Sequence, residues 1–259
     1  MQDAHTHFFG RPFFNAIAAL SPRDADGLVE EVASEAGLEL PDPDSAAHAS
    51  RWLGEMDDHG VERMVTFASA PPEAPAVSEA AAASGGRQVG YTVVDPTAEP
   101  AVDFAAKALG EMGLRGLLTF PVMQHFLPGD EPFARVCEVA REHGAPVIVH
   151  CGNLEVKLRD LMGIRQDYDL TFGDPLAIAP AADRFPEVTF IVPHFGGSCF
   201  EQALELGGRC PNVMVDTSSS NSWMAELDLD LGQVFHRALA VFGPERILFG
   251  TDSCTFPRG

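Results

Sequence analysis

Histidine or aspartate residues stand at the carboxyl ends of four short apolar runs in this 259-residue chain. They are His5 and His7 in Asp3-Ala4-His5-Thr6-His7, His150 after Val147-Ile148-Val149, His194 after Ile191-Val192-Pro193, and Asp252 after Leu248-Phe249-Gly250-Thr251. Imidazole nitrogens and a carboxylate oxygen suit zinc, or a similar divalent ion such as manganese or iron. A single such histidine is more simply explained as a structural residue, but the repeated pattern favours a catalytic metal centre.

The apolar runs predict buried strands that alternate with helices. We expect strands over residues 2–7, 61–68, 87–95, 114–120, 146–151, 188–194, 211–217 and 246–252, and helices over 44–59, 73–84, 98–112, 131–144, 174–185, 198–208 and 231–242. Strands that are apolar throughout are typical of parallel sheets, which are covered on both faces. The pattern therefore predicts an α/β fold, a (β/α)8 TIM barrel over residues 1–259 as a single domain, with the metal centre at the carboxyl ends of its strands. The first strand is not followed by the glycine pattern of a dinucleotide-binding fold.

Composition excludes several classes of partner. The formal net charge of −21 argues against nucleic acid and against anionic membrane surfaces, because both require a basic footprint. The five cysteines fit no zinc motif and are expected to be free thiols in a reducing compartment. There is no pattern of a signal peptide and no apolar run of the roughly 20 residues that span a bilayer. We expect a soluble, cytoplasmic protein.

Two long connections, residues 8–43 and 152–173, leave the carboxyl ends of strands and should overhang the site. Candidate substrate-binding residues are Arg11 in the first connection, Arg159 and Arg165 in the second, and His125 after the fourth strand. An arginine fork beside aromatic rings would suit a planar carboxylate. The alternative is that the arginines pair with surface acids and that the phenylalanines of the first connection pack at the barrel mouth. Ser218, Ser219, Ser220 and Asn221 either contact substrate or cap the next helix.

The chain ends seven residues after Asp252, before any eighth helix of a complete barrel. We expect either a truncated product or a partner that covers the contact between the eighth and first strands. Exposed apolar surface at this contact would favour a homodimer.

The motifs Asp3-Ala4-His5-Thr6-His7, Pro193-His194-Phe195-Gly196-Gly197 and Phe249-Gly250-Thr251-Asp252 resemble those of the amidohydrolase superfamily. The resemblance extends over residues 1–259 and is to the amidohydrolase-related branch, which includes aminocarboxymuconate-semialdehyde decarboxylase and γ-resorcylate decarboxylase. It implies one divalent metal, expected to be zinc with manganese or iron as alternatives, held by His5, His7, His150 and Asp252. It also implies that His194 activates water or moves protons. The bridging lysine or glutamate of binuclear members is absent from residues 114–120.

The leading expectation for activity is metal-dependent hydrolysis of a small ester, lactone, amide or C–C substrate, with His194 and Asp252 as catalytic residues. The first alternative is non-oxidative decarboxylation of an aromatic or unsaturated acid by the same site. Two others are an inactive metal-binding barrel fragment, which the missing eighth helix suggests, and a barrel without metal whose histidines are structural.

Overall fold

Eight parallel strands form one sheet whose order follows the chain from β1 to β8. The computed structural model describes residues 1–24, 26–154, 156–219 and 223–254. The strands are β1 (Gln2–His7), β2 (Arg63–Ala68), β3 (Gln88–Val93), β4 (Gly116–Thr119), β5 (Val147–Val149), β6 (Phe190–Val192), β7 (Val213–Asp216) and β8 (Ile247–Leu248). Each strand pairs in parallel with the next. The predicted barrel and the position of every predicted strand are confirmed.

The segment that follows β8 closes the ring against β1. The Asp252 amide donates to the His5 carbonyl at 2.9 Å, and the His7 amide donates to the Ser253 carbonyl at 2.8 Å. Thr6 and Ser253 form an isolated parallel bridge. The backbone of Asp252 is therefore bonded directly to the strand that carries both histidines.

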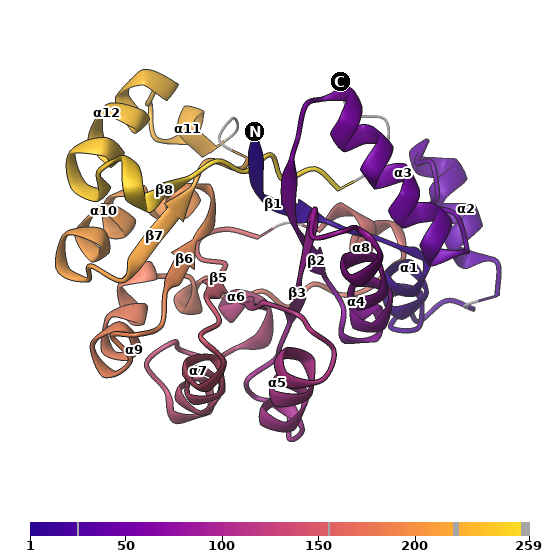
Figure 1. Cartoon of the computed structure of the whole chain (residues 1–259), viewed down its shortest axis with the longest axis horizontal. Coiled ribbons are helices and arrows are strands. Elements are labelled where there is room, and N and C mark those ends of the chain that lie inside the picture. Colours follow the sequence, from indigo (N-terminus) through magenta and orange to yellow (C-terminus); the bar gives the residue numbers. More distant parts are fainter. Residues whose placement is uncertain (25, 155, 220–222, 255–259) are drawn as a thin grey trace.

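Helices form the outer layer around the strands (Figure 1). They are α1 (Arg11–Ala18), α2 (Leu28–Ala36), α3 (Ser45–Asp58), α4 (Ala74–Ala83), α5 (Ala101–Gly110), α6 (Pro121–Gln124), α7 (Glu131–His143), α8 (Lys157–Leu161), α9 (Ala179–Arg184), α10 (Phe200–Arg209), α11 (Trp223–Glu226) and α12 (Leu231–Phe242). Short 3-10 helices are η1 (Pro71–Glu73), η2 (Leu170–Phe172), η3 (Pro175–Ile178), η4 (Pro193–Cys199) and η5 (Pro244–Arg246). The α7 helix ends at Gly144 in the left-handed conformation (φ 60°), which glycine adopts without a steric penalty.

Alternate residues of a strand pack on the inside and on the outside of the barrel. Ile148 packs in the barrel interior with side chains from neighbouring strands, such as Phe67 and Leu118. Its neighbours Val147 and Val149 pack outward, in the cluster that the helices cover. Successive residues of a strand point to opposite faces, and here both faces are buried. Each strand therefore needs apolar residues at successive positions rather than an alternation of apolar and polar ones.

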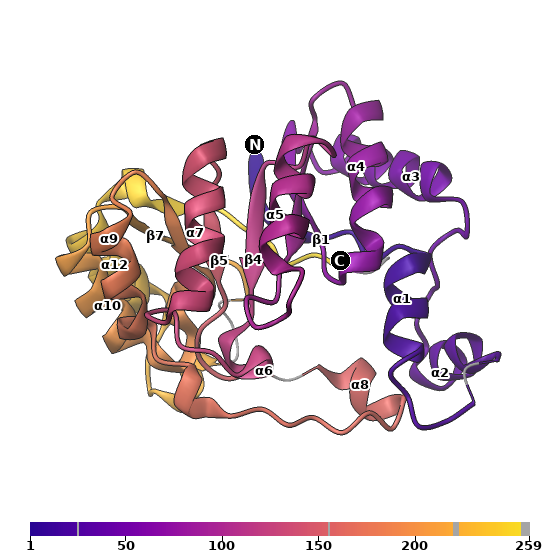
Figure 2. The ribbon, with the colours of Figure 1, turned by 90° about the horizontal axis from the view of Figure 1, so that it is seen from below.

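The two long connections pack against each other beside the barrel (Figure 2). They contain α1, α2 and α8, helices that the sequence analysis did not predict. Phe13 and Phe14 are buried in one cluster with Met162. The Ser21 hydroxyl donates to the Met162 carbonyl at 2.6 Å. Phe13 and Phe14 therefore have the packing role, whereas the half-buried Phe9 lies against His7, with ring centroids 4.9 Å apart.

No helix follows β8 within the described residues, which end at Cys254. Phe249, next to β8, is 44% exposed. The homodimer expected at this edge stays a prediction. None of the described helices is both long and apolar enough to cross a membrane.

The carboxyl group of Glu73 links the segments that follow β1 and β2. Its side chain is fully buried. One oxygen accepts the Gly10 amide at 2.6 Å, and the other accepts the Ser69 amide at 2.8 Å. Burial raises the pKa of Glu73 to about 8, against the smaller lowering effect of the two amide hydrogen bonds. A neutral carboxyl is therefore favoured by the folded state.

The free energy of unfolding should fall as the pH rises because of Glu73. The stabilisation from a raised folded-state pKa is fully present below the unfolded pKa of about 4.3, and it is lost as the pH rises through about 8. Within this window the free energy of unfolding of the wild type should fall by on the order of 1.4 kcal/mol per pH unit relative to that of Glu73→Gln. Urea unfolding of both proteins between about pH 5.5 and about pH 8.5 measures this. A difference that does not vary with pH would contradict the raised pKa.

Candidate metal centre

His5, His7 and Asp252 bring three potential metal ligands together at the carboxyl ends of β1 and β8. Their ligand atoms all lie within 4.8 Å of one another. Oδ1 of Asp252 is 3.4 Å from Nε2 of His5 and 3.2 Å from Nε2 of His7. Asp252 adopts a left-handed backbone conformation (φ 59°), which is strained for a residue with a side chain. The tight turn after β8 thus directs this carboxylate toward the two imidazoles.

A buried carboxylate that the sequence analysis did not single out holds His5 in place. Oδ2 of Asp216, at the end of β7, lies 2.8 Å from Nδ1 of His5. Burial alone would raise the pKa of Asp216, but the charge and hydrogen bond of His5, with smaller effects of His194 and Ser218, lower it to about 2. The signal was present, because Val213-Met214-Val215-Asp216 is an apolar strand closed by a polar residue, like the other four.

The other oxygen of Asp216 organises the turn that carries His194. Oδ1 accepts the amides of His194 and Ser218, each at 3.0 Å, and also the Ser218 hydroxyl. His194 and Phe195 both have positive φ (57° and 55°), so this turn after β6 is strained. The Ser218 hydroxyl oxygen lies 2.9 Å from Nδ1 of His194. Ser218 is thus a site residue, whereas Ser220 and Asn221 lie outside the described residues.

His194 lies between the metal-ligand group and His150. Its ring centroid is 5.2 Å from that of His5 and 5.0 Å from that of His150. The Nε2 atoms of His194 and His150 are 3.2 Å apart. His150 therefore lies beside His194 and outside the three-residue group. Nδ1 of His150 is buried without a hydrogen-bond partner among the described residues.

The surroundings of both histidines disfavour the charged form. Burial, with a smaller effect of the His194 charge, lowers the pKa of His150 to about 3. Burial and the His5 charge lower the pKa of His194, although Asp216 and Asp252 act in the opposite direction. Neutral imidazoles can accept a proton or bind a metal.

Asp3 fixes the spacing between the histidine pair and Asp252. Its Oδ1 accepts the amides of His5 at 3.0 Å and Thr251 at 3.1 Å, and its Oδ2 accepts the Thr251 hydroxyl at 2.6 Å. Burial raises the pKa of Asp3, although these hydrogen bonds oppose it. The aspartate of the Asp3-Ala4-His5-Thr6-His7 motif therefore connects β1 to the segment after β8.

The donor set fits a divalent metal ion. Nδ1 of His5 contacts Asp216, and Nδ1 of His7 lies 2.7 Å from the Ser69 hydroxyl oxygen. This leaves the Nε2 atom of each ring directed at the Asp252 carboxylate. Metal-binding histidines typically have such a partner on the nitrogen that does not bind the metal.

The arginines of the first and second connections differ in their surroundings. Arg11 pairs with Glu30 at 2.5 Å, as the surface-pair alternative predicts, and Arg165 is exposed. Arg159 lies against Met123, with Nη1 3.9 Å from the sulfur. Its Nε is buried and has no hydrogen-bond partner among the described residues.

His125 is exposed and belongs to the surface of the mouth. Its Nε2 lies 2.5 Å from the Asp167 carbonyl oxygen, and its ring stacks on Phe172. These contacts tie the segment after β4 to the second long connection. They leave Arg159 as the predicted substrate-binding residue whose surroundings best suit that role.

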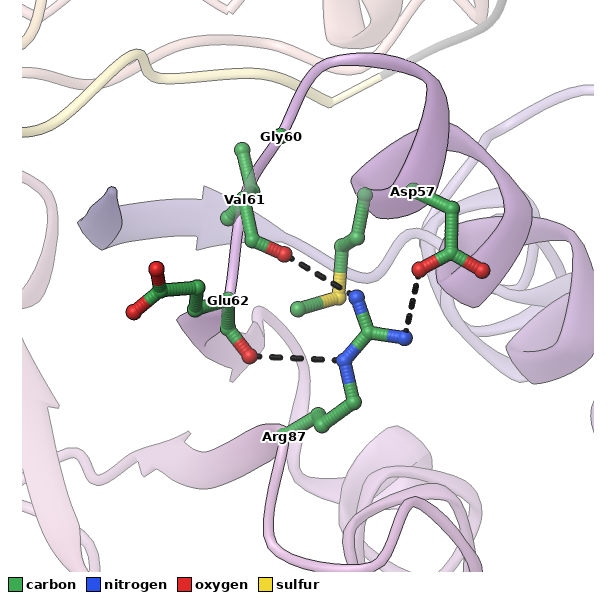
Figure 3. A pocket seen from close by; sticks show the side chains of 6 residues that line it. Asp57, Gly60, Val61, Glu62 and Arg87 are labelled. Atoms are coloured by element: carbon green, nitrogen blue, oxygen red, sulfur yellow. Dashed lines mark hydrogen bonds and ion pairs between the residues drawn. The ribbon is translucent and has the colours of Figure 1, made fainter.

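A pocket of about 410 Å³ lies at the opposite, amino-terminal ends of β2 and β3 (Figure 3). Arg87 lies at its centre, but the protein itself uses the donors of this guanidinium. They reach Asp57 at 2.7 Å, the Val61 carbonyl at 3.0 Å and the Glu62 carbonyl at 3.3 Å. Arg87 therefore holds α3 to the sheet, and the pocket is separate from the metal centre.

The family profile described as amidohydrolase matches residues 3–258. The chain therefore belongs to the amidohydrolase family, and it is an enzyme of that family. No curated protein matches in a sequence search.

Solved structures share the fold at low identity. The 5-carboxyvanillate decarboxylase of Sphingomonas paucimobilis is 16% identical, with a TM-score of 0.64, covering 97% of this chain and 88% of the other. A dihydroxybenzoic acid decarboxylase of Polaromonas with bound manganese and the inhibitor 2-nitroresorcinol is 17% identical, with a TM-score of 0.58, covering 97% and 85%. A probable 2-pyrone-4,6-dicarboxylic acid hydrolase of Acinetobacter baumannii with bound citric acid is 13% identical, with a TM-score of 0.61, covering 97% and 83%.

Replacement of Asp216 by asparagine should weaken binding of Zn²⁺ or Mn²⁺ by roughly 10- to 100-fold, because the amide removes the charge that orients His5. Competition with a metal-binding dye measures the dissociation constant. Asp103→Asn, on the exposed face of α5, is the matched control and should bind metal like wild type. Equal affinity of Asp216→Asn and wild type would show that His5 does not need this partner.

Proposed function

We propose that this enzyme is a metal-dependent, non-oxidative decarboxylase of a phenolic or unsaturated carboxylic acid. The observation that carries the proposal is the convergence of His5, His7 and Asp252 beside the neutral imidazole of His194. The reaction class is supported by the decarboxylases that share the fold. This replaces the leading expectation of hydrolysis, which the comparisons support less well than its alternative.

One divalent ion would be held by His5, His7 and Asp252, with His150 as the further ligand predicted from the sequence. When bound, such an ion polarises substrate oxygens and lowers the pKa of bound water. Manganese and zinc both suit two imidazoles and a carboxylate. Manganese in the Polaromonas decarboxylase makes it a metal to test first beside zinc.

His194 and Asp252 would take part in the proton transfer of the reaction. In a decarboxylation of this kind His194 would first take up a proton from water or from the substrate hydroxyl and pass it to the carbon that bears the carboxylate. The bond to the carboxylate then breaks, CO2 leaves, and the bonding electrons return to the ring. Ser218 and Asp216 hold the ring and backbone of His194. A positioned imidazole that is neutral near pH 7 can take up and return such a proton.

The substrate carboxylate would be bound by Arg159. Its Nε is free of partners among the described residues, and apolar Met123 lies beside its guanidinium. A guanidinium in weakly polar surroundings binds a carboxylate more strongly than one in open water. Arg11 has its charge matched by Glu30 and is the weaker candidate.

Hydrolysis of a lactone is the second candidate function. It is favoured by one observation, the probable 2-pyrone-4,6-dicarboxylic acid hydrolase with the same fold and a TM-score of 0.61. The same ligands and the same proton carrier would serve an attack by water on a carbonyl carbon.

Paired assays of the Mn²⁺- and Zn²⁺-loaded protein decide between these reactions. Carboxylated phenols such as 5-carboxyvanillate and 2,6-dihydroxybenzoate are tested for CO2 release, and 2-pyrone-4,6-dicarboxylate is tested for ring opening. We expect CO2 release without ring opening. Ring opening without CO2 release from any acid of the panel would establish the hydrolase instead.

Substitution of His194 should affect turnover more than metal binding. His194→Asn should lower kcat by roughly 100- to 10,000-fold, because the proton carrier is lost. Metal affinity should stay close to wild type, since His194 lies outside the three-residue group. His143→Asn, at the exposed end of α7, serves as the control. An unchanged kcat in His194→Asn would remove this residue from the mechanism.

A further inference from the structure

Ser69 lies between the buried Glu73 carboxyl and the metal-ligand group. Ser69 directly follows β2, and its amide donates to Oε2 of Glu73 at 2.8 Å. Its hydroxyl oxygen lies 2.7 Å from Nδ1 of His7. His7 in turn presents Nε2 to Asp252 at 3.2 Å. Ser69 therefore contacts Glu73 through its backbone amide and a candidate metal ligand through its side chain.

Glu73 determines where this hydroxyl lies because both of its oxygens are used. The second oxygen accepts the amide of Gly10, the residue that precedes α1. A Cβ atom at Gly10 would lie only 3.0 Å from the ring of Phe8, so the backbone packs closely here. The carboxyl thus fixes the end of β2 relative to the chain that leaves β1, and the Ser69 hydroxyl is held facing His7.

This contact accommodates the tautomer of His7 that binds a metal through Nε2. For Nε2 to bind a metal it must carry a lone pair, so Nδ1 must carry the ring proton. The Ser69 oxygen is an acceptor at hydrogen-bond distance from Nδ1 and can take that proton as a hydrogen bond. Without an acceptor at this place, the ring could equally protonate Nε2 and donate to Asp252.

We propose that Ser69 and Glu73 are positioning residues for the metal centre: Ser69 orients His7 and accepts the Nδ1 proton of its metal-binding tautomer, and Glu73 holds Ser69 in place. This inference rests on the metal centre of the proposed function but not on the reaction it performs. Neither residue would touch the substrate, so both would act through His7.

Metal binding by the full chain tests the role of Ser69. Competition with a metal-binding dye gives the Zn²⁺ affinity of wild type, Ser69→Ala and Ser69→Thr. Ser69→Ala should lose roughly 10- to 100-fold in affinity at an unchanged Tm, and Ser69→Thr, which restores the hydroxyl, should return to within about threefold of wild type. Ser78→Ala is the matched control, because the Ser78 hydroxyl donates to the backbone carbonyl of Met112 at 2.6 Å.

Two further measurements separate positioning from a general structural role. Nitrogen-15 NMR of the zinc-loaded wild type should show His7 protonated at Nδ1. Glu73→Ala should also weaken Zn²⁺ binding, because the amides of Gly10 and Ser69 then lose their acceptor. Adding it to Ser69→Ala should cause little further loss, since both changes act on the same contact.

The outcomes distinguish this inference from the proposed function. A wild type that binds no Zn²⁺ or Mn²⁺ would overturn both. A wild type that binds metal, with Ser69→Ala of equal affinity or with His7 protonated at Nε2, would overturn the positioning role alone. If the loss of Zn²⁺ affinity in the double variant equals the sum of the losses in the two single variants, the role assigned to Glu73 would be overturned.

Discussion

The carboxylate of Asp216 is bonded to both parts of the candidate site, and their relative placement depends on it. One oxygen orients His5 on β1, and the other holds the backbone of His194 after β6 together with Ser218 after β7. A buried carboxylate is costly unless its charge is paired and its oxygens are hydrogen-bonded. Asp216 meets both conditions only when the turns after β6 and β7 and the end of β1 come together. The same contacts that make its burial tolerable therefore assemble the metal ligands beside the proton carrier.

Closure of the barrel supplies the remaining constraint. Strand β8 is only two residues long, and the chain after it returns along β1 through backbone bonds and the Asp3–Thr251 contacts. Asp252 is left in a strained backbone conformation next to His7. Strained residues persist where the surrounding structure holds them. Here the hydrogen bonds on both sides of Asp252 hold it, and they keep its carboxylate directed at the two imidazoles.

Sequence patterns predicted the strands well and the connections less well. Apolar runs such as Val147–Val149 mark buried strands because parallel strands are covered on both sides. The predicted loops of residues 8–43 and 152–173 contain helices that pack on one another, since Phe13, Phe14 and Met162 find their burial only in a neighbouring segment. The arginines show the same difficulty: Arg11 pairs with Glu30, a partner that its own neighbours in sequence do not reveal.

What the sequence by itself determined is the barrel, the candidate ligands His5, His7 and Asp252, and the place of His194 at a strand end. These follow from local rules, because a strand's side chains alternate and its carboxyl end opens at one face of the barrel. Only the tertiary structure decided how those residues meet: Asp216 behind His5, Ser69 behind His7, His150 beside His194 and Asp3 across the closure. Each of these is a contact between different strands, whose register and turns depend on packing of the whole barrel. The sequence marks Asp216 as the polar end of an apolar strand, but it does not show which residue this side chain meets.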